Sequence, residues 1–170
     1  MKEAVPKLAN IVVLWDPTTA MVQTKAVAEA ARLVNVNSEV LEVRAQSEIP
    51  SVFAAASARR PDGMLILSSP VASIYSKDFA DMALKYRLPA ISIFANFPRA
   101  GGLMSYGPEL ADVYRETGIM AAKVLKGSKP ADLPAERPSR FELVVNMLTA
   151  KAMNLTISPV MQQRADEVIE

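Results

Sequence analysis

The sequence predicts an α/β fold built on an open, doubly wound and mostly parallel sheet of five to six strands. Short apolar, β-branched runs alternate with helical patterns along most of the chain. That alternation is typical of βαβ units joined by right-handed crossovers. The run at 64–67 is apolar at every position, as expected of a central parallel strand that is buried on both faces.

Each predicted element rests on the period of its apolar residues and on the turn residues that bound it. The predicted strands are 10–15, 39–44, 64–67, 90–94, 103–106 and 140–146. The predicted helices are 20–34, 49–59, 71–86, 109–126 and 147–153, followed by a helical tail from Ser158-Pro159. Gly127 is expected to cap the helix before it, and the prolines within 128–139 predict an extended linker.

Composition argues against several classes of function. The chain has no cysteine and no histidine, so it lacks thiolate nucleophiles, disulfides and the commonest general base and metal ligand. Its 19 basic and 18 acidic residues nearly cancel, which gives no reason to propose a nucleic-acid partner. No run is long and apolar enough for a membrane helix, and Met1–Pro6 lacks the apolar core of a signal peptide.

The candidate binding residues follow the ends of predicted strands, because ligands of open parallel sheets bind outside the carboxyl ends of the strands. These candidates offer aromatic faces, hydroxyls, one amide and one carboxylate, which suits a non-covalent site for a small molecule. They are Trp15, Asp16, Ser68, Ser69, Phe94, Asn96, Ser105 and Tyr106. No metal and no cofactor is expected, since no glycine-rich nucleotide fingerprint follows the first strand.

Several of these candidates have an equally simple structural explanation. Trp15 would also fill the core between sheet and helix. Asp16, Ser68 and Ser69 would also serve as caps or loop-forming residues, and Asn96 as a turn residue. Tyr106 lies between a Gly-Gly turn and a Gly-Pro break, which favours a residue that stacks on a ligand or lies beside a hinge.

A family resemblance extends over nearly the whole chain. It is carried by the segments 12–17, 100–108, 110–114, 126–134, 141–146, 149–151, 155–157 and 164–169. Together they resemble the ABC-transporter substrate-binding proteins whose better-known members bind tryptophan or related amino acids. No single segment is decisive, but the set is specific.

The resemblance implies a type I periplasmic-binding fold, in which two lobes close on a ligand and the chain crosses between them. Family members are about twice as long, with a signal or lipoprotein segment and a first lobe ahead of this point. The implied division is a lead-in at 1–9, a second lobe at 10–100, a crossover strand, helix and linker at 101–139, and a returning strand with C-terminal helices at 140–170.

The function implied is solute capture for an ABC importer, without enzymatic activity. The chain would supply about half of a cleft for a small organic ligand such as an amino acid. Its partner would be an ABC permease, and its location would be periplasmic or membrane-anchored outside the cytoplasm. Two alternatives remain open: a ligand-sensing regulatory lobe, and a flavodoxin-like nucleotide-binding enzyme domain on the same sheet.

A lone lobe would leave apolar surface exposed, and the helix at 109–126 would lack the first lobe on which it normally packs. Exposed apolar surface on that scale usually finds a partner. We therefore expect a homodimer, or a rearranged single sheet that takes the strand at Leu103 and its helix onto its own edge.

Overall fold

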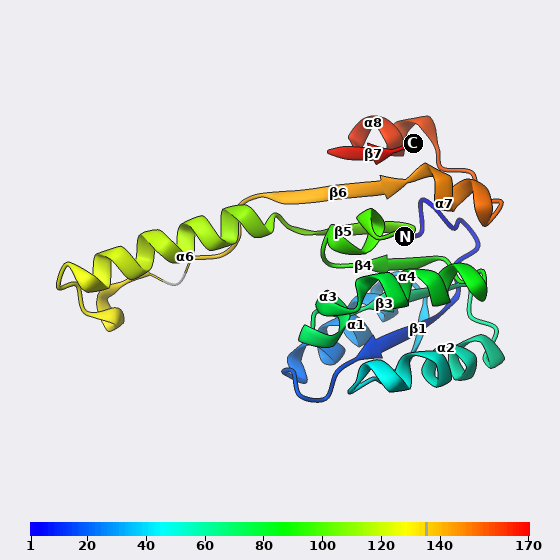
Figure 1. Cartoon of the computed structure of the whole chain (residues 1–170), viewed down its shortest axis with the longest axis horizontal. Helices are drawn as coiled ribbons and strands as arrows, with labels where there is room; N and C mark the ends of the chain where they lie inside the picture. Colours follow the sequence, from blue (N-terminus) through cyan, green and yellow to red (C-terminus); the bar gives the residue numbers. More distant parts are fainter. Residues whose placement is uncertain (135) are drawn as a thin grey trace.

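A computed structural model describes residues 1–134 and 136–170 and contains one seven-stranded sheet of order β2-β1-β3-β4-β5-β6-β7 (Figure 1). The strands are β1 Asn10–Trp15, β2 Asn37–Glu42, β3 Gly63–Ile66, β4 Ala90–Ser92, β5 Met104–Pro108, β6 Phe141–Asn146 and β7 Glu167–Ile169. All neighbours are parallel except β5 and β6. The predicted α/β class with a mostly parallel sheet is confirmed.

Helices connect the strands and cover both faces of the sheet. They are α1 Val22–Leu33, α2 Ile49–Ala58, α3 Pro70–Ile74, α4 Ser76–Lys85, α5 Asn96–Arg99, α6 Leu110–Leu125, α7 Met147–Ala152 and α8 Pro159–Arg164. Short 3-10 turns lie at Gln46–Glu48 and Pro130–Asp132. The predicted linker at 128–139 includes Ala135, which lies outside the described residues.

The prediction of five to six strands was wrong by one strand. The seventh, β7, lies in the region predicted as a helical tail and pairs in parallel with β6, Val145 opposite Val168. Its three residues have no strand pattern of their own, and their extended conformation depends on β6 beside them.

The predicted helix at 71–86 is two helices with a break at Tyr75, whose backbone leaves the helical region. The short helix α5 was not predicted at all. By contrast, α6 ends as predicted: Gly127 has a positive φ of 102°, and the N–H of Ser128 donates to the carbonyl oxygen of Lys123 at 3.1 Å. These are the features of a Schellman C-cap.

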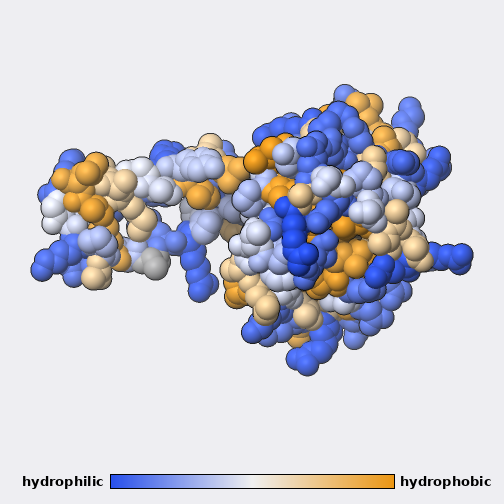
Figure 2. Space-filling view, turned by 60° about the horizontal axis from the view of Figure 1, so that its bottom comes forward, coloured by the Kyte–Doolittle hydropathy of each residue, from blue (hydrophilic) through white to orange (hydrophobic). Residues whose placement is uncertain are grey.

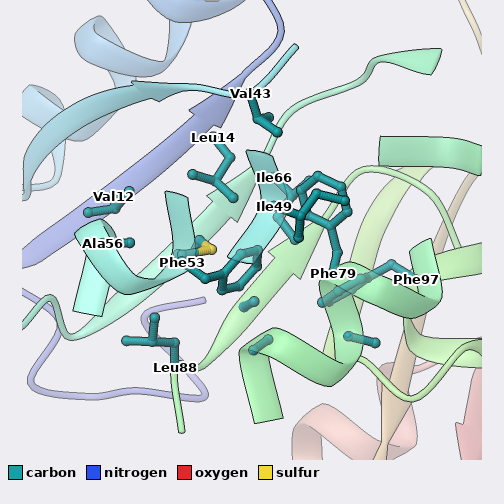
Figure 3. Packing of buried hydrophobic residues seen from close by; sticks show 14 of the residues in the cluster. Val12, Leu14, Val43, Ile49, Phe53, Ala56, Ile66, Phe79, Leu88 and Phe97 are labelled. Atoms are coloured by element: carbon teal, nitrogen blue, oxygen red, sulfur yellow. The ribbon is translucent and has the colours of Figure 1, made fainter. Parts of the chain in front are cut away.

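The strand order determines which helices cover which face. The chain moves one way from β1 to β2 and the other way from β2 through β3 and β4 to β5. Right-handed crossovers therefore place α1 on one face and α2, α4 and α5 on the other. The second face holds the largest core cluster, where the rings of Phe53 and Phe79 meet edge to face at 5.8 Å between centroids (Figure 3).

The α1 face is covered less completely. A cluster around Val13 and Ala31 packs α1 over β1 and β3. A separate cluster around Val145 and Met161 packs α8 over the same face at the other end of the sheet, on β5 and β6. Between these two clusters the sheet residues Leu65 and Ile91 are only partly buried.

The helix α6 leaves the body as an arm (Figures 1 and 2). Among its 16 described residues only Asp112 is buried, while Tyr114 is 71% and Leu125 is 88% exposed. The strand before it, β5, does join the sheet beside β4, but as an inner strand and not at the edge that the rearranged-sheet alternative expected, because β6 and β7 lie beyond it. The helix itself does not fold back onto the sheet edge, which contradicts the other half of that alternative.

Candidate functional site

The carboxyl ends of β1, β3 and β4 meet at one edge of the sheet. Six of the eight predicted site residues lie at the last residue of these strands or in the segments that follow them: Trp15, Asp16, Ser68, Ser69, Phe94 and Asn96. Because β5 is parallel to β4 and leads into α6, the arm projects from this same edge (Figure 1). We call these segments, 15–19, 68–71 and 94–96, the strand-end edge.

The first segment of the strand-end edge is organised by Asp16. This residue is 2% exposed, and its Oδ1 accepts hydrogen bonds from the backbone N–H of Thr18 at 2.9 Å and from the Thr18 hydroxyl at 2.7 Å. The Asp16 carbonyl oxygen accepts from Thr19 as well. Asp16 therefore forms the loop, as its structural explanation anticipated.

A side chain that the sequence reasoning missed joins the first two segments. The amide of Gln23, on the first turn of α1, donates from Nε2 to the carbonyl oxygen of Ser68 at 3.2 Å and to the hydroxyl of Thr19 at 3.3 Å. Gln23 had no signal in the sequence, because its partner is 45 residues away.

The third segment is joined to α3, the helix that follows the second segment. Ser69 is buried and caps α3, its Oγ accepting the N–H of Ala72 at 3.0 Å. The side-chain amide of Asn96 donates to the carbonyl oxygen of Ser73 at 2.9 Å. The helix α3 and the start of α5 are therefore held against each other by a polar contact close to the strand-end edge.

Trp15 is half buried at the end of β1 and packs against the cluster on the α1 face. Among the described residues, its indole Nε1 is buried and has no hydrogen-bond partner. An unpaired buried donor costs free energy and is uncommon, so the indole N–H lacks the partner that such a group normally has.

The structure does not bring Ser105 and Tyr106 to this edge. The strand β5 runs on to Pro108, so both residues lie inside the sheet and not at its end. Ser105 is fully buried, and its hydroxyl has no partner within the described chain. Tyr106 is exposed on the α1 face and stacks on Phe141 with 5.8 Å between ring centroids.

Charged side chains gather where the arm joins the sheet. Arg99 donates to the carboxylate of Glu167 at 2.6 Å, and lies 3.6 Å from the carboxylate of Glu142. Burial raises the pKa of Glu142 above its ordinary 4.5, while Arg99 acts in the opposite direction and the carboxylate of Glu109 adds to the increase. Glu109 is in turn paired with Arg140 at 3.2 Å.

The residues at the strand-end edge suit binding better than catalysis. Their polar groups are hydroxyls, amides and one carboxylate that is committed to its own loop. In the described residues no group of three His, Cys, Asp or Glu side chains could hold a metal ion. In the same part of the chain, no helix combines the length and the apolar character needed to cross a membrane.

The fold is that of one lobe of a periplasmic-binding protein. The chain belongs to the family described as ABC transporter substrate binding protein, whose sequence profile matches residues 1–169. The predicted family is therefore confirmed. No curated protein matches the chain.

Solved structures share the fold. A conserved domain protein from Vibrio cholerae is 18% identical with a TM-score of 0.91, over 98% of this chain and 57% of that one. An ABC domain in complex with L-Trp from Streptococcus pneumonia is 23% identical with the same score, over 99% and 57%. A ligand-free, open substrate-binding protein with adhesive properties from Clostridium difficile is 19% identical with a TM-score of 0.73, over 99% and 57%. The chain thus spans little more than half the length of these proteins.

Proposed function

We propose that this chain binds a small organic solute, such as an amino acid, as the second-lobe half of a cleft in a component of an ABC importer. The observation that carries the proposal is the convergence of three separate segments on the strand-end edge. Gln23 joins the first two segments, Asn96 joins the third to α3, and the buried, unpaired indole N–H of Trp15 lies at the end of β1. Family membership supports the same role.

The proposed ligand is a small molecule with an apolar or aromatic group and a hydrogen-bond acceptor. Trp15 and Phe94, both half buried, would provide the apolar wall, and the Trp15 Nε1 would donate to the acceptor. A structural relative of this fold is in complex with L-Trp. We include Asp16, Ser68, Ser69 and Asn96 as residues that shape the wall, and leave out Ser105 and Tyr106 because they lie inside β5, away from this edge.

We propose no catalytic role. A nucleophile and base pair is not part of the strand-end edge, and the one buried carboxylate there accepts hydrogen bonds within its own loop. The remaining side chains orient and enclose a ligand, which is the chemistry of a binding site.

The test uses the only tryptophan of the chain as its probe. Its indole N–H gives a single resonance in a proton–nitrogen NMR spectrum. Titration with L-amino acids, aromatic ones first, should shift this resonance and the backbone amide resonances within 16–19 and 68–72, where all residues except Pro17 and Pro70 carry an N–H. Binding is expected to be weak, because half of the contacts are missing. The Leu148→Ala variant, changed at an exposed site on α7, serves as the control and should show the same shifts. If amino acids and small organic acids at millimolar concentration move none of these resonances, the proposal is wrong.

We further propose the division into lobe and crossover elements. The second lobe is 10–100, with lead-in 1–9, crossover elements 101–139 and returning elements 140–170. The arm would pack on the first lobe of a longer protein, outside the cytoplasm and in contact with an ABC permease. The exposed apolar residues of α6 support this role.

Without a first lobe, the same residues of α6 would join two copies of the chain as a homodimer. Light scattering on the eluting peak of a gel-filtration column measures the mass. Tyr114→Glu should shift a dimer toward monomer, whereas Val160→Glu, on the exposed face of α8, should not. A monomer at every concentration would refute the homodimer.

A further inference from the structure

Basic side chains gather at the edge of the sheet opposite the strand-end edge, where the parallel strands begin. Lys7, Arg60 and Arg87 each lie three residues ahead of a strand, β1, β3 and β4 respectively. Arg32 and Lys85 lie in the last turns of α1 and α4, which end at the same edge. All of these residues are exposed, and Figure 2 shows strongly hydrophilic residues projecting from the end of the body away from the arm. We call them the basic row.

The segments that carry the basic row lie side by side. The carbonyl oxygen of Asn10 accepts the N–H of Asp62 at 2.9 Å, and that of Pro89 accepts the N–H of Met64 at 2.8 Å. These bonds join the segments ahead of β1, β3 and β4, and neighbouring strands are about 4.8 Å apart. The row therefore extends across three adjacent strands.

The acidic groups at this edge are engaged elsewhere. Asp62 accepts two backbone N–H bonds, and Glu39 is paired with Arg59 at 2.6 Å. Glu29 lies one turn before Arg32 on α1 without an ion pair to it. Within the described residues, no carboxylate lies within ion-pairing distance of any member of the basic row. This edge is therefore positive, although the net charge of the chain is only +1.

The backbone conformation of two members favours a use for their side chains. Arg60 and Arg87 follow α2 and α4 with left-handed φ angles of 49° and 51°. Asn35 and Asn154 have similar angles after α1 and α7, and Asn or Gly is the usual residue at such a helix end. A left-handed arginine costs free energy that Gly would avoid. Because neither guanidinium has an ion pair in the described chain, the strain indicates a role for these groups outside it.

An exposed apolar side chain lies beside the basic row. Leu33 follows Arg32 at the end of α1 and is 81% exposed. Basic and apolar side chains together suit the surface of a lipid bilayer, where cations meet the phosphates and an apolar group enters between the headgroups. A nucleic acid also offers phosphates, which guanidinium groups bind through paired hydrogen bonds, but it has no apolar layer for the leucine.

We propose that the basic row, with Leu33, docks the chain on an anionic phospholipid surface. The row is spread over three strands and two helix ends, which suits an array of headgroups better than a single small anion. This edge faces away from the strand-end edge and the arm, so docking would leave the proposed solute site open (Figure 1). The proposal does not depend on which solute is bound.

The test is sedimentation of the whole 170-residue chain with vesicles. Vesicles of phosphatidylcholine with about 30% phosphatidylglycerol present an anionic surface, and vesicles of phosphatidylcholine alone do not. At low salt the chain should pellet with the anionic vesicles and stay in solution with the neutral ones. Salt at about 1 M, where charges are screened beyond about 3 Å, should release most of the chain.

Two pairs of substitutions connect binding to the basic row. Arg60→Glu with Arg87→Glu should lower partition onto the anionic vesicles at least tenfold, because each basic residue near such a surface changes partition about fivefold. Lys123→Glu with Lys126→Glu makes the same change of charge at the exposed far end of the arm. This control should bind the vesicles as the natural chain does.

A third pair separates binding from folding. Arg60→Gly with Arg87→Gly introduces the residue that adopts a left-handed φ most easily, so the urea midpoint should hold or rise. Partition onto the anionic vesicles should still fall, because both guanidinium groups are lost. Leu33→Ala should also weaken binding to these vesicles.

Three results would overturn the proposal. In the first, the natural chain does not pellet with anionic vesicles at low salt, or the Arg60→Glu, Arg87→Glu variant pellets equally well. In the second, the glycine pair lowers the urea midpoint and leaves partition unchanged, so that the arginines serve the fold alone. In the third, the chain ignores the vesicles and binds a DNA duplex through Arg60 and Arg87, which would make a nucleic acid the partner.

Discussion

The Nε2 of Gln23 lies 3.2 Å from the carbonyl oxygen of Ser68 and donates a hydrogen bond to it, joining the first turn of α1 to the loop that follows β3. This contact holds two of the three segments of the strand-end edge in one arrangement. A preorganised edge binds a ligand at a lower entropic cost than one whose loops must first be ordered.

Gln23→Ala should therefore loosen the strand-end edge more than the rest of the molecule. One hydrogen bond contributes about 0.5–1.5 kcal/mol, so the loss of global stability should be of that order. Hydrogen exchange followed by NMR should show faster exchange of the Thr19 and Ala72 amides, with no change in the strands. The control is Gln162→Ala, which removes a side-chain bond to the Ile157 carbonyl far from this edge. Equal exchange at Thr19 and Ala72 in both variants would contradict the role given to Gln23.

Asp62 fastens the lead-in to the turn before β3. Its Oδ2 accepts the backbone N–H of Ala9 at 2.9 Å and of Asn10 at 2.8 Å, and these bonds hold its pKa below the ordinary 3.8. Because the folded pKa is lowered, the ionised group contributes stability above the ordinary pKa, and this stability is lost as the pH falls through the folded pKa.

Asp62→Ala should accordingly cost about 1 kcal/mol at neutral pH, a value reduced by exposure to solvent. The difference from the natural chain should shrink as the pH falls below 3.8. Urea unfolding at a series of pH values measures it. A difference that does not vary with pH would show that ionisation of Asp62 contributes nothing.

Glu142 should have the opposite dependence on pH. Burial is the largest cause of its raised pKa, so the protonated form is favoured in the folded chain. The stability that this provides is fully present below the ordinary pKa of 4.5 and is lost as the pH rises through the folded pKa.

Relative to Glu142→Gln, the natural chain should thus lose stability between pH 4 and neutral pH. Urea midpoints of both proteins across that range measure the difference, and Glu29→Gln, at an exposed position on α1, controls for the removal of one negative charge. If the natural chain gains stability over Glu142→Gln as the pH rises, the pairing with Arg99 outweighs the cost of burial and the prediction is wrong.

Gly107 and Gly118 offer a matched pair of glycine substitutions. A Cβ on Gly107 would lie 2.1 Å from the backbone carbonyl oxygen of Ile93, which cannot move without disturbing β4. Gly107→Ala should cost about 1–3 kcal/mol through overpacking. Gly118 lies within α6 with nothing within 4 Å of the added atom, so Gly118→Ala should stabilise the helix by about 0.5–1 kcal/mol. Thermal unfolding monitored by circular dichroism should show changes of opposite sign, and changes of the same sign would contradict this description of the join between arm and sheet.

The sequence by itself determined the elements whose signals are local. The apolar run of β3, the period of α6 and the Gly127 cap are properties of neighbouring residues, and the structure agrees with each of them. The alternation of strands and helices was sufficient to predict the fold class. It also placed most of the candidate residues at the strand-end edge, because the carboxyl ends of parallel strands meet on one side.

Only the tertiary structure decided the features that depend on distant partners. The residues of β7 are extended because β6 lies beside them. Gln23 matters because folding brings Ser68 to it, and Tyr106 lies inside the sheet, not at its end, because β5 continues two residues further than predicted. The direction of α6 depends on where β5 ends, because the helix begins two residues after that strand and leads away from the sheet (Figure 1). Each of these requires pairing or packing between segments far apart in the chain, which periodicity and turn residues do not encode.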